Sequence, residues 1–280
     1  MNPYLSIVMG IGGDLGGGLA DRLCNSLANT IALAEEFGVP SEVVLVIWNA
    51  PNFKFKLGEA VSLACPVRVI QTGDLHSRVP NPHGFRYFEW YPKNIGIRCA
   101  RGEFVLSTNP DDILSDALFS YFAKPKLQHG YFYRVNRHDT RDGEIYRVCW
   151  ASGAFPIGTP KEVINRGLPR ALPLFHNPIH YNASGDFTLM GRDEWFLIHG
   201  NPERDYNHTV DGQTLFLAHQ KGLKQIILPY PIFHPDHPRT LNVSRTGAFV
   251  GPEWDDHFPF TQENGEDWGF AGMEFEETIL

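Results

Sequence analysis

Short apolar runs alternate with helical patterns through the first half of this 280-residue chain. Apolar side chains recur near the helical period from Leu19 to Ala34, and a second helix is predicted over Pro92–Ala100. Runs typical of buried strands lie around these helices, at Tyr4–Gly10, Glu42–Trp48, Val67–Gln71 and Glu103–Thr108. Because strands that alternate with helices assemble into a mostly parallel sheet flanked by helices, the pattern predicts an α/β fold.

The second half is less regular. We expect strands at Gly130–Asn136, Asp186–Met190 and Lys224–Leu228. We expect helices at Leu114–Phe122, Arg192–His199 and Asp211–Lys221. Residues 151–182 are rich in Pro, Gly and His, which predicts loops. With no internal repeat and no separating linker, the chain is expected to form one domain with a sizeable core.

The net charge of −8 is concentrated at the C-terminus. Nine of the 32 acidic residues follow Arg245, the last basic residue, so residues 1–245 carry a net charge of about +1. A nearly neutral body argues against a duplex-binding protein with a broad cationic face. The tail also carries large aromatic residues, which predicts that it docks on its own body or on a second subunit; they include Trp254, Phe258, Phe260, Trp268, Phe270 and Phe275.

Composition also bears on location. No apolar run reaches the roughly 18 residues of a transmembrane helix, and the N-terminus lacks the cationic start of a signal peptide. The four cysteines are too widely spaced for a CxxC metal site or a dense disulfide framework. They predict buried free thiols and a cytoplasmic protein.

A glycine-rich loop, GIGGDLGGG at residues 10–18, joins the first strand to the first helix. Glycines there let backbone N–H groups approach a phosphate at a helix N-terminus. No acidic residue ends the second strand and no GxxxxGK[ST] motif follows, which disfavours a dinucleotide fold and a P-loop. The loop predicts a nucleotide contact, with a tight turn as the alternative.

Four polar positions are candidates for chemistry. Asp111, in the segment NPDD after the fourth strand, suits a divalent cation, with an Asx turn through Asp112 as the alternative. The segment HPDH at residues 234–237 offers two imidazole ligands. Asp211 heads a helix, as an N-cap or as a general base. Asp186 opens a strand and either contacts a ligand or caps a turn. Neither a GxSxG nucleophile motif nor an HExxH motif is present.

Together these segments resemble the GT-A glycosyltransferases. Residues 93–108, KNIGIRCARGEFVLST, resemble the family's Asn-x-Gly-x-x-x-Ala-x-Gly helix and strand, which leads into a metal-binding Asp-x-Asp. That motif is here Asn109-x-Asp111. Residues 185–203, GDFTLMGRDEWFLIHGNPE, resemble the acceptor-side stretch. The resemblance covers roughly residues 4–240, and in detail the sequence is most similar to a bacterial and phage subgroup of the family.

The resemblance implies one GT-A-like domain over residues 1–245, with a nucleotide-sugar-binding half at 1–112 and an acceptor-binding half at 113–245. Residues 246–280 would form an irregular acidic and aromatic tail. It implies transfer of a hexosyl or pentosyl group from a nucleoside diphosphate sugar to a hydroxyl of a glycan or other acceptor. The tail could also support a homo-oligomer.

The resemblance also assigns roles to residues. Asp211 would be the catalytic base of an inverting reaction, and Asp186 and Trp195 would bind the acceptor. A Mn²⁺ or Mg²⁺ ion would be held by Asp111 with His234 or His237. The nucleotide sugar would contact Gly12, Gly13, Asp14, Arg22, Trp48, Asn49, Lys93, Asn109 and Asp111.

Three alternatives stay open at this stage. A phage-type enzyme that glycosylates a modified base in DNA could use the basic and aromatic residues of 76–101, although a duplex base would have to be flipped out. A nucleotidyltransferase shares a similar α/β core. The asparagine at 109 would also suit a non-catalytic protein that binds nucleotide sugars.

Overall fold

The computed structural model describes residues 2–12, 18–55, 65–142, 144–149, 179–181, 183–206, 210–237 and 262–280. Within these residues, eight strands form a central sheet in the order β10-β6-β9-β4-β1-β2-β3-β12. Their bounds are β1 Leu5–Ile11, β2 Ser41–Ile47, β3 Val67–Gln71, β4 Phe104–Thr108, β6 Tyr131–Arg134, β9 Phe187–Gly191, β10 Lys224–Ile227 and β12 Glu276–Ile279. Strands β4, β1, β2 and β3 run parallel, whereas β9 and β12 pair antiparallel with their neighbours. The mostly parallel α/β sheet predicted from the apolar runs is confirmed.

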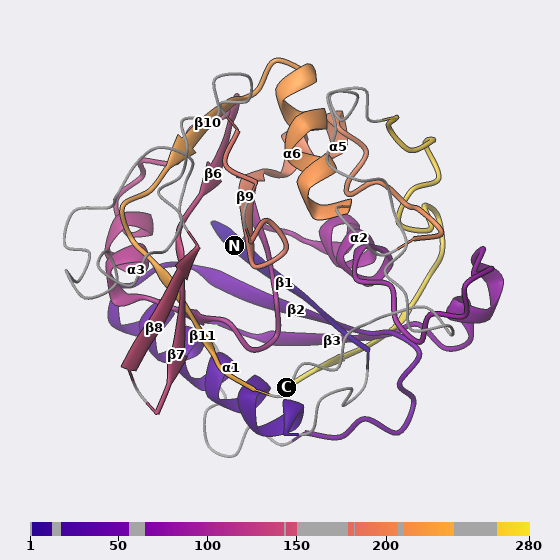
Figure 1. Ribbon diagram of the computed structural model, residues 1–280, viewed down its shortest axis with the longest axis horizontal. Helices are drawn as coiled ribbons and strands as arrows, with labels where there is room; N and C mark the ends of the chain where they lie inside the picture. The colour runs from indigo at the N-terminus through magenta and orange to yellow at the C-terminus, as the bar shows by residue number, and fades with distance from the viewer. Residues whose placement is uncertain are drawn as a thin grey trace.

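Helices cover both faces of this sheet (Figure 1). Helices α1 (Leu19–Glu36) and α3 (Asp116–Phe122) pack on one face, and α2 (Trp90–Cys99), α5 (Arg192–Leu197) and α6 (Val210–Gln220) pack on the other. Successive side chains of a strand point to opposite faces, so the central strands β1 and β2 are buried along their whole length and feed two separate cores. A short 3-10 helix, η1 (Leu75–Arg78), lies in the connection between β3 and α2.

A second, smaller sheet follows the carboxyl end of β4. Its order is β5-β11-β7-β8, from β5 Ile113–Leu114, β11 Ile232–Pro235, β7 Arg137–Arg141 and β8 Glu144–Cys149. The sequence did not predict this sheet, because its strands are short and rich in polar residues. It matters for the site because β7 and β11 bring Arg137 and His234 to the end of β4.

Helix α2 lies unusually close to the central sheet. A Cβ on Gly96 would be 2.4 Å from Cγ1 of Val8, so only glycine allows this approach. The close contact fixes the position of Lys93, which lies one turn earlier on the same helix and is buried.

The described part of the C-terminal tail, residues 262–280, docks on the body of its own chain. Trp268 is 1% exposed and packs edge-to-face on Phe196, while the Arg98 guanidinium lies 4.2 Å from the Trp268 ring centroid. Farther along the tail, β12 pairs with β3, and the Glu277 carboxylate forms an ion pair with the Arg68 guanidinium at 2.7 Å. The predicted docking on the body is therefore confirmed for these residues; Trp254, Phe258 and Phe260 lie outside the described residues.

The tail is also more regular than the sequence predicted. Every residue of β12 is exposed, so the strand shows no apolar alternation that would reveal it. Among the described residues, no helix combines the length and the apolar character needed to cross a bilayer. Cys24, Cys65 and Cys99 are free thiols, of which Cys65 is buried and the other two are half-buried.

Candidate functional site at the carboxyl end of the parallel strands

The segment after β4 forms a turn closed by a buried carboxylate. Asp112 is fully buried, and its Oδ2 accepts hydrogen bonds from the Asn109 N–H at 3.2 Å and from the Thr108 hydroxyl at 3.3 Å. Ser115 is the N-cap residue of α3, but its side chain makes no capping hydrogen bond to the start of that helix. Asp112 thus closes the turn, which leaves the Asp111 side chain for the site.

Asp111 lies beside two histidines that are more than a hundred residues away in sequence. Its Oδ2 is 3.1 Å from Nε2 of His237, and one ligand atom from each of Asp111, His234 and His237 lies within 4.8 Å of the others. Arg22 from α1 places its Nε 3.2 Å from the same Asp111 oxygen. The structure therefore brings together four predicted site residues from α1, the β4 turn and the end of β11.

These three side chains fit a divalent metal ion by their chemistry. One carboxylate oxygen and two imidazole nitrogens suit Mn²⁺ or a similar borderline cation. Burial, opposed by the charges of Asp186 and Asp111, lowers the pKa of His234, so its ring is neutral near pH 7 and keeps the lone pair that a metal needs. Among the described residues, this group is the one that combines three such ligands.

A chain of charged hydrogen bonds crosses the site from α2 to β7. Lys93 Nζ forms an ion pair with Glu89 and donates to Asn109 Oδ1 at 2.8 Å. Asn109 Nδ2 donates to Asp186 Oδ1 at 2.7 Å, and Arg137 Nη1 donates to Asp186 Oδ2 at 2.7 Å. Burial alone would raise the pKa of Asp186, but the positive charges of Arg137 and Lys93 lower it. Asp186 is consequently held as a carboxylate.

Asp211 lies in the first turn of α6, beside the loop that precedes β9. Its Oδ2 accepts from the Ser184 hydroxyl at 2.7 Å and from the Gly185 N–H at 2.8 Å. A Cβ on Gly185 would lie 2.7 Å from Glu89 Oε1 and 3.4 Å from Asp211 Oδ2, so both carboxyl groups flank this residue. Burial raises the pKa of Glu89, and the negative charge of Asp211 raises it further. The positive charge of Lys93 opposes both effects without cancelling them.

A fully buried arginine supports this acidic region. Arg134 on β6 donates to the carbonyl oxygens of His180 and Ser184 and to the Thr188 hydroxyl. Burial lowers the pKa of Arg134 to about 10, against the opposing effect of nearby carboxylates. The guanidinium remains charged at neutral pH and holds the loop that donates to Asp211.

The end of β1 is covered by an aromatic ring. A Cβ on Gly12 would lie 2.1 Å from the Tyr87 ring, and a Cβ on Gly10 would lie 2.6 Å from the Tyr87 hydroxyl oxygen. Only glycine at positions 10 and 12 leaves room for the Tyr87 side chain. Tyr87 therefore lies over the start of the glycine-rich loop. Gly13 and Asp14, predicted to contact the nucleotide, lie outside the described residues.

Three other predicted site residues are not brought to this cluster. Trp48 is fully buried, stacks on Tyr91 at 5.5 Å and donates to His76. Trp195 is also fully buried and donates to the Val105 carbonyl. Asn49 is exposed, with a φ of 52°, and donates to the Arg86 carbonyl. The two tryptophans belong to the core between the sheet and its second helical layer.

Sequence reasoning missed Tyr87, Glu89, Arg134 and Arg137. Glu89 carried a usable signal, since it stands four residues before Lys93 at the start of a helix, a spacing that favours an ion pair. The other three reach the site through contacts between elements that are distant in sequence, which a motif does not reveal.

Known proteins resemble this chain in structure but not in sequence. No family model and no curated protein matches it. Residues 1–349 of S. aureus TarS, crystallised with UDP-GlcNAc, match at 14% identity and a TM-score of 0.54, over 88% of this chain and 62% of that one. The same fragment with UDP matches at 15% identity and a TM-score of 0.52, over 83% and 60%. The chain has the GT-A fold.

The GT-A fold predicted from the sequence is thus confirmed, whereas its bacterial and phage subgroup stays a prediction. A longer TarS structure matches at 14% identity and a TM-score of 0.51, over 83% of this chain and 37% of that one. This GT-A chain therefore spans less than two thirds of the TarS chains that it matches.

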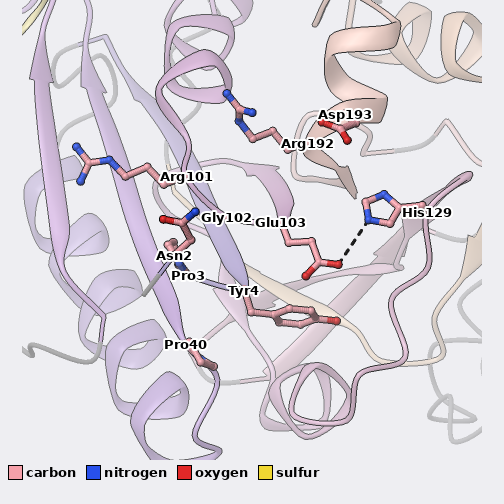
Figure 2. A pocket seen from close by; sticks show the side chains of 10 residues that line it. All are labelled: Asn2, Pro3, Tyr4, Pro40, Arg101, Gly102, Glu103, His129, Arg192 and Asp193. Carbon is pink, nitrogen blue, oxygen red and sulfur yellow. Dashed lines mark ion pairs between the residues drawn. The ribbon is translucent and has the colours of Figure 1, made fainter.

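A concavity lies at the other end of the parallel strands of the GT-A sheet, near the start of β1 and β4. It encloses about 550 Å³ and is lined by residues that include Tyr4, Arg101, Arg192 and Asp193. Figure 2 shows the Glu103 carboxylate directed toward His129, at 3.5 Å. His129 also contacts Glu194 at 3.0 Å. His129 thus pairs with two carboxylates at this end of the sheet.

This pairing gives the stability of the GT-A domain a pH dependence. The hydrogen bond to Glu194, with Glu103 adding to it, raises the pKa of His129. A raised pKa stabilises the fold below the ordinary histidine value of about 6.5, and the contribution is lost as pH rises through the folded value. His129→Gln should therefore lower the free energy of unfolding more at pH 6 than at pH 9, as measured by urea denaturation.

The matched control is His219→Gln, which alters an exposed histidine at the end of α6. It should change stability little at either pH. An equal loss for His129→Gln at pH 6 and pH 9 would contradict the assignment of the pH dependence to this pair.

Proposed function

We propose that this chain is a metal-dependent glycosyltransferase that moves a hexosyl or pentosyl group from a nucleoside diphosphate sugar to an acceptor hydroxyl. The observation that carries the proposal is the convergence of Asp111, His234, His237 and Arg22 at the carboxyl end of the parallel strands, where ligands bind in open α/β sheets. The TarS complexes with UDP-GlcNAc and UDP support a uridine diphosphate sugar as the donor.

We propose that Asp111, His234 and His237 hold the metal ion, and their mixed oxygen and nitrogen ligands favour Mn²⁺ over Mg²⁺. When bound, the ion would neutralise the developing charge of the diphosphate leaving group. Arg22 beside Asp111 would add a second positive charge on the same side, and Gly12, Gly13 and Asp14 would line the nucleotide. This assigns the donor to the half of the domain formed by residues 1–112.

We propose Asp211 as the general base. Both of its described hydrogen bonds reach Oδ2, which leaves Oδ1 to accept the proton of an acceptor hydroxyl. Attack by that hydroxyl opposite the leaving group would invert the anomeric carbon. Asp186, held as a carboxylate by Arg137, would orient the acceptor from the half formed by residues 113–245. The free thiols fit a reducing, cytoplasmic location.

The metal proposal predicts that Asp111→Asn weakens Mn²⁺ binding by at least about 10-fold, because it removes the one carboxylate among the three ligands. Isothermal titration of the purified protein with Mn²⁺ measures this. Asp116→Asn is the matched control, since Asp116 is an exposed carboxylate five residues along. Mn²⁺ binding by Asp111→Asn at the affinity of the unaltered protein would contradict the site.

The function is tested with a panel of UDP-, GDP- and dTDP-sugars in the presence of Mn²⁺. We expect one donor to raise the denaturation midpoint and to release its nucleoside diphosphate when an acceptor is supplied. Release of pyrophosphate from a nucleoside triphosphate would indicate a nucleotidyltransferase instead. Salt-sensitive binding of DNA would indicate a nucleobase acceptor, and binding of a donor without any release would indicate a non-catalytic protein.

A further inference from the structure

Asn109 stands where the resembling family carries the first carboxylate of its Asp-x-Asp motif, and both ends of its amide are engaged. Its oxygen faces the Lys93 ammonium at 2.8 Å, and its nitrogen faces the Asp186 carboxylate at 2.7 Å. An ammonium group can only donate and an ionised carboxylate can only accept, so this orientation of the amide follows from its two partners.

The side chain joins parts of the chain that are otherwise separate. Lys93 belongs to α2, Asn109 follows β4, and Asp186 precedes β9 and is paired with Arg137 of β7. Lys93 and Asp186 are both less than 5% exposed, so their hydrogen bonds form in a weakly screened environment. A single amide thus couples an ammonium group on one side of the site to a carboxylate on the other.

An aspartate at this position could still accept from Lys93 but could not donate to Asp186. Two carboxylate oxygens would then meet at hydrogen-bond distance, which strongly disfavours ionisation of both. The nearby cations do not offset another negative charge, because Lys93 is already paired with Glu89 and Arg137 with Asp139 and Asp186. The surroundings of position 109 therefore select an amide over a carboxylate.

We propose that Asn109 is a positioning residue that aligns Lys93 with Asp186, and that it is not a ligand of the metal site. Binding of the metal ion then depends on Asp111 and the two histidines. The motif lacks its first carboxylate because position 109 instead links Lys93 to Asp186. The proposal rests on the proposed function for the roles of the metal ion and of Asp186. The hydrogen bonds of Asn109 can nevertheless be tested without any substrate.

The test is a swap of the two side chains. N109D should lower the thermal denaturation midpoint by about 5–10 °C, because it opposes two buried carboxylates. N109D/D186N should recover most of that loss, since the amide at 186 can donate to the carboxylate at 109 and accept from Arg137. D186N alone supplies the fourth corner of the double-mutant cycle.

The matched control is N109D/D112N. Asp112 is a buried acidic side chain that accepts from the Asn109 backbone N–H, so D112N makes the same aspartate-to-asparagine change at a neighbour that does not face the amide. It should recover little of the loss. A midpoint for N109D equal to that of the unaltered protein, or recovery by D112N as complete as by D186N, would overturn the proposal. If N109D does not fold, recovery of folded protein only with D186N supports it, and failure of both double variants overturns it.

Mn²⁺ titration supplies a readout that a purely structural role would not move. N109D/D186N carries the two-carboxylate motif in full, so a metal-facing position 109 would raise Mn²⁺ affinity by about 10-fold or more. We expect the affinity to stay within about 2-fold of the unaltered protein, and a 10-fold gain would overturn the proposal. If the unaltered protein binds no Mn²⁺, the proposed function fails while the denaturation cycle still decides the role of Asn109.

Discussion

Asp211→Asn should lower turnover by about 10²–10⁴-fold, the range expected when a general base is removed. The substitution preserves size, and its amide oxygen can still accept from Ser184 and Gly185, so the head of α6 should keep its position. The amide cannot take a proton from the acceptor hydroxyl. Donor binding should therefore persist while the chemical step slows, which is the signature of an interaction made only in the transition state.

The measurements are kcat with a saturating donor and, separately, the dissociation constant of that donor. Asp193→Asn is the matched control, because Asp193 is an exposed acidic residue in the first turn of α5 and lines the concavity near the start of β1 and β4. It should leave turnover within about 2-fold, as surface substitutions usually do. Loss of donor binding in Asp211→Asn would show that Asp211 contacts the nucleotide sugar and would refute its role as the base.

Trp268→Ala should lower the free energy of unfolding by about 3–5 kcal/mol, the usual cost of truncating a buried tryptophan. Trp268 packs against Phe196 and Arg98, and its ring lies 2.6 Å from where a Cβ on Gly200 would be. The truncation leaves a cavity and also loosens the segment around it, in which Gly269 donates to Glu203.

Guanidinium chloride denaturation of the full chain measures this loss. Met273→Ala is the control from the same segment, since Met273 is 42% exposed and its truncation should cost less than about 1 kcal/mol. A Trp268→Ala variant that is as stable as Met273→Ala would show that the segment adds little to the fold.

The central sheet could be predicted because its signal is local. Strands β1, β2 and β4 are buried on both faces, so each contains a mostly apolar run that is bounded by polar or turn residues. Strands β7 and β11 carry Arg137 and His234 toward a polar site, and these residues interrupt the apolar pattern that would have marked them as strands. Strand β12 was missed for the opposite reason, because it is exposed throughout.

The candidate site was predictable only in part. Asp111, His234 and His237 were found because metal ligands are chemically distinctive and because the segments resembled a known family. Trp48 was assigned to the nucleotide because it follows a strand that ends at the site, but the direction of its side chain depends on packing against Tyr91. Glu89 and Arg137 acquire their roles only when three or four elements meet, which no linear pattern records.

The pairing of β12 with β3 has a consequence for protein synthesis. The strand that covers this edge of the sheet is made about 200 residues after the strand that it covers. A copy that ends before Glu276 would expose the unpaired N–H and C=O groups of β3, a template for adding a strand from another molecule. Incomplete copies should therefore aggregate and be removed by cellular quality control, while a copy that includes β12 closes its own edge.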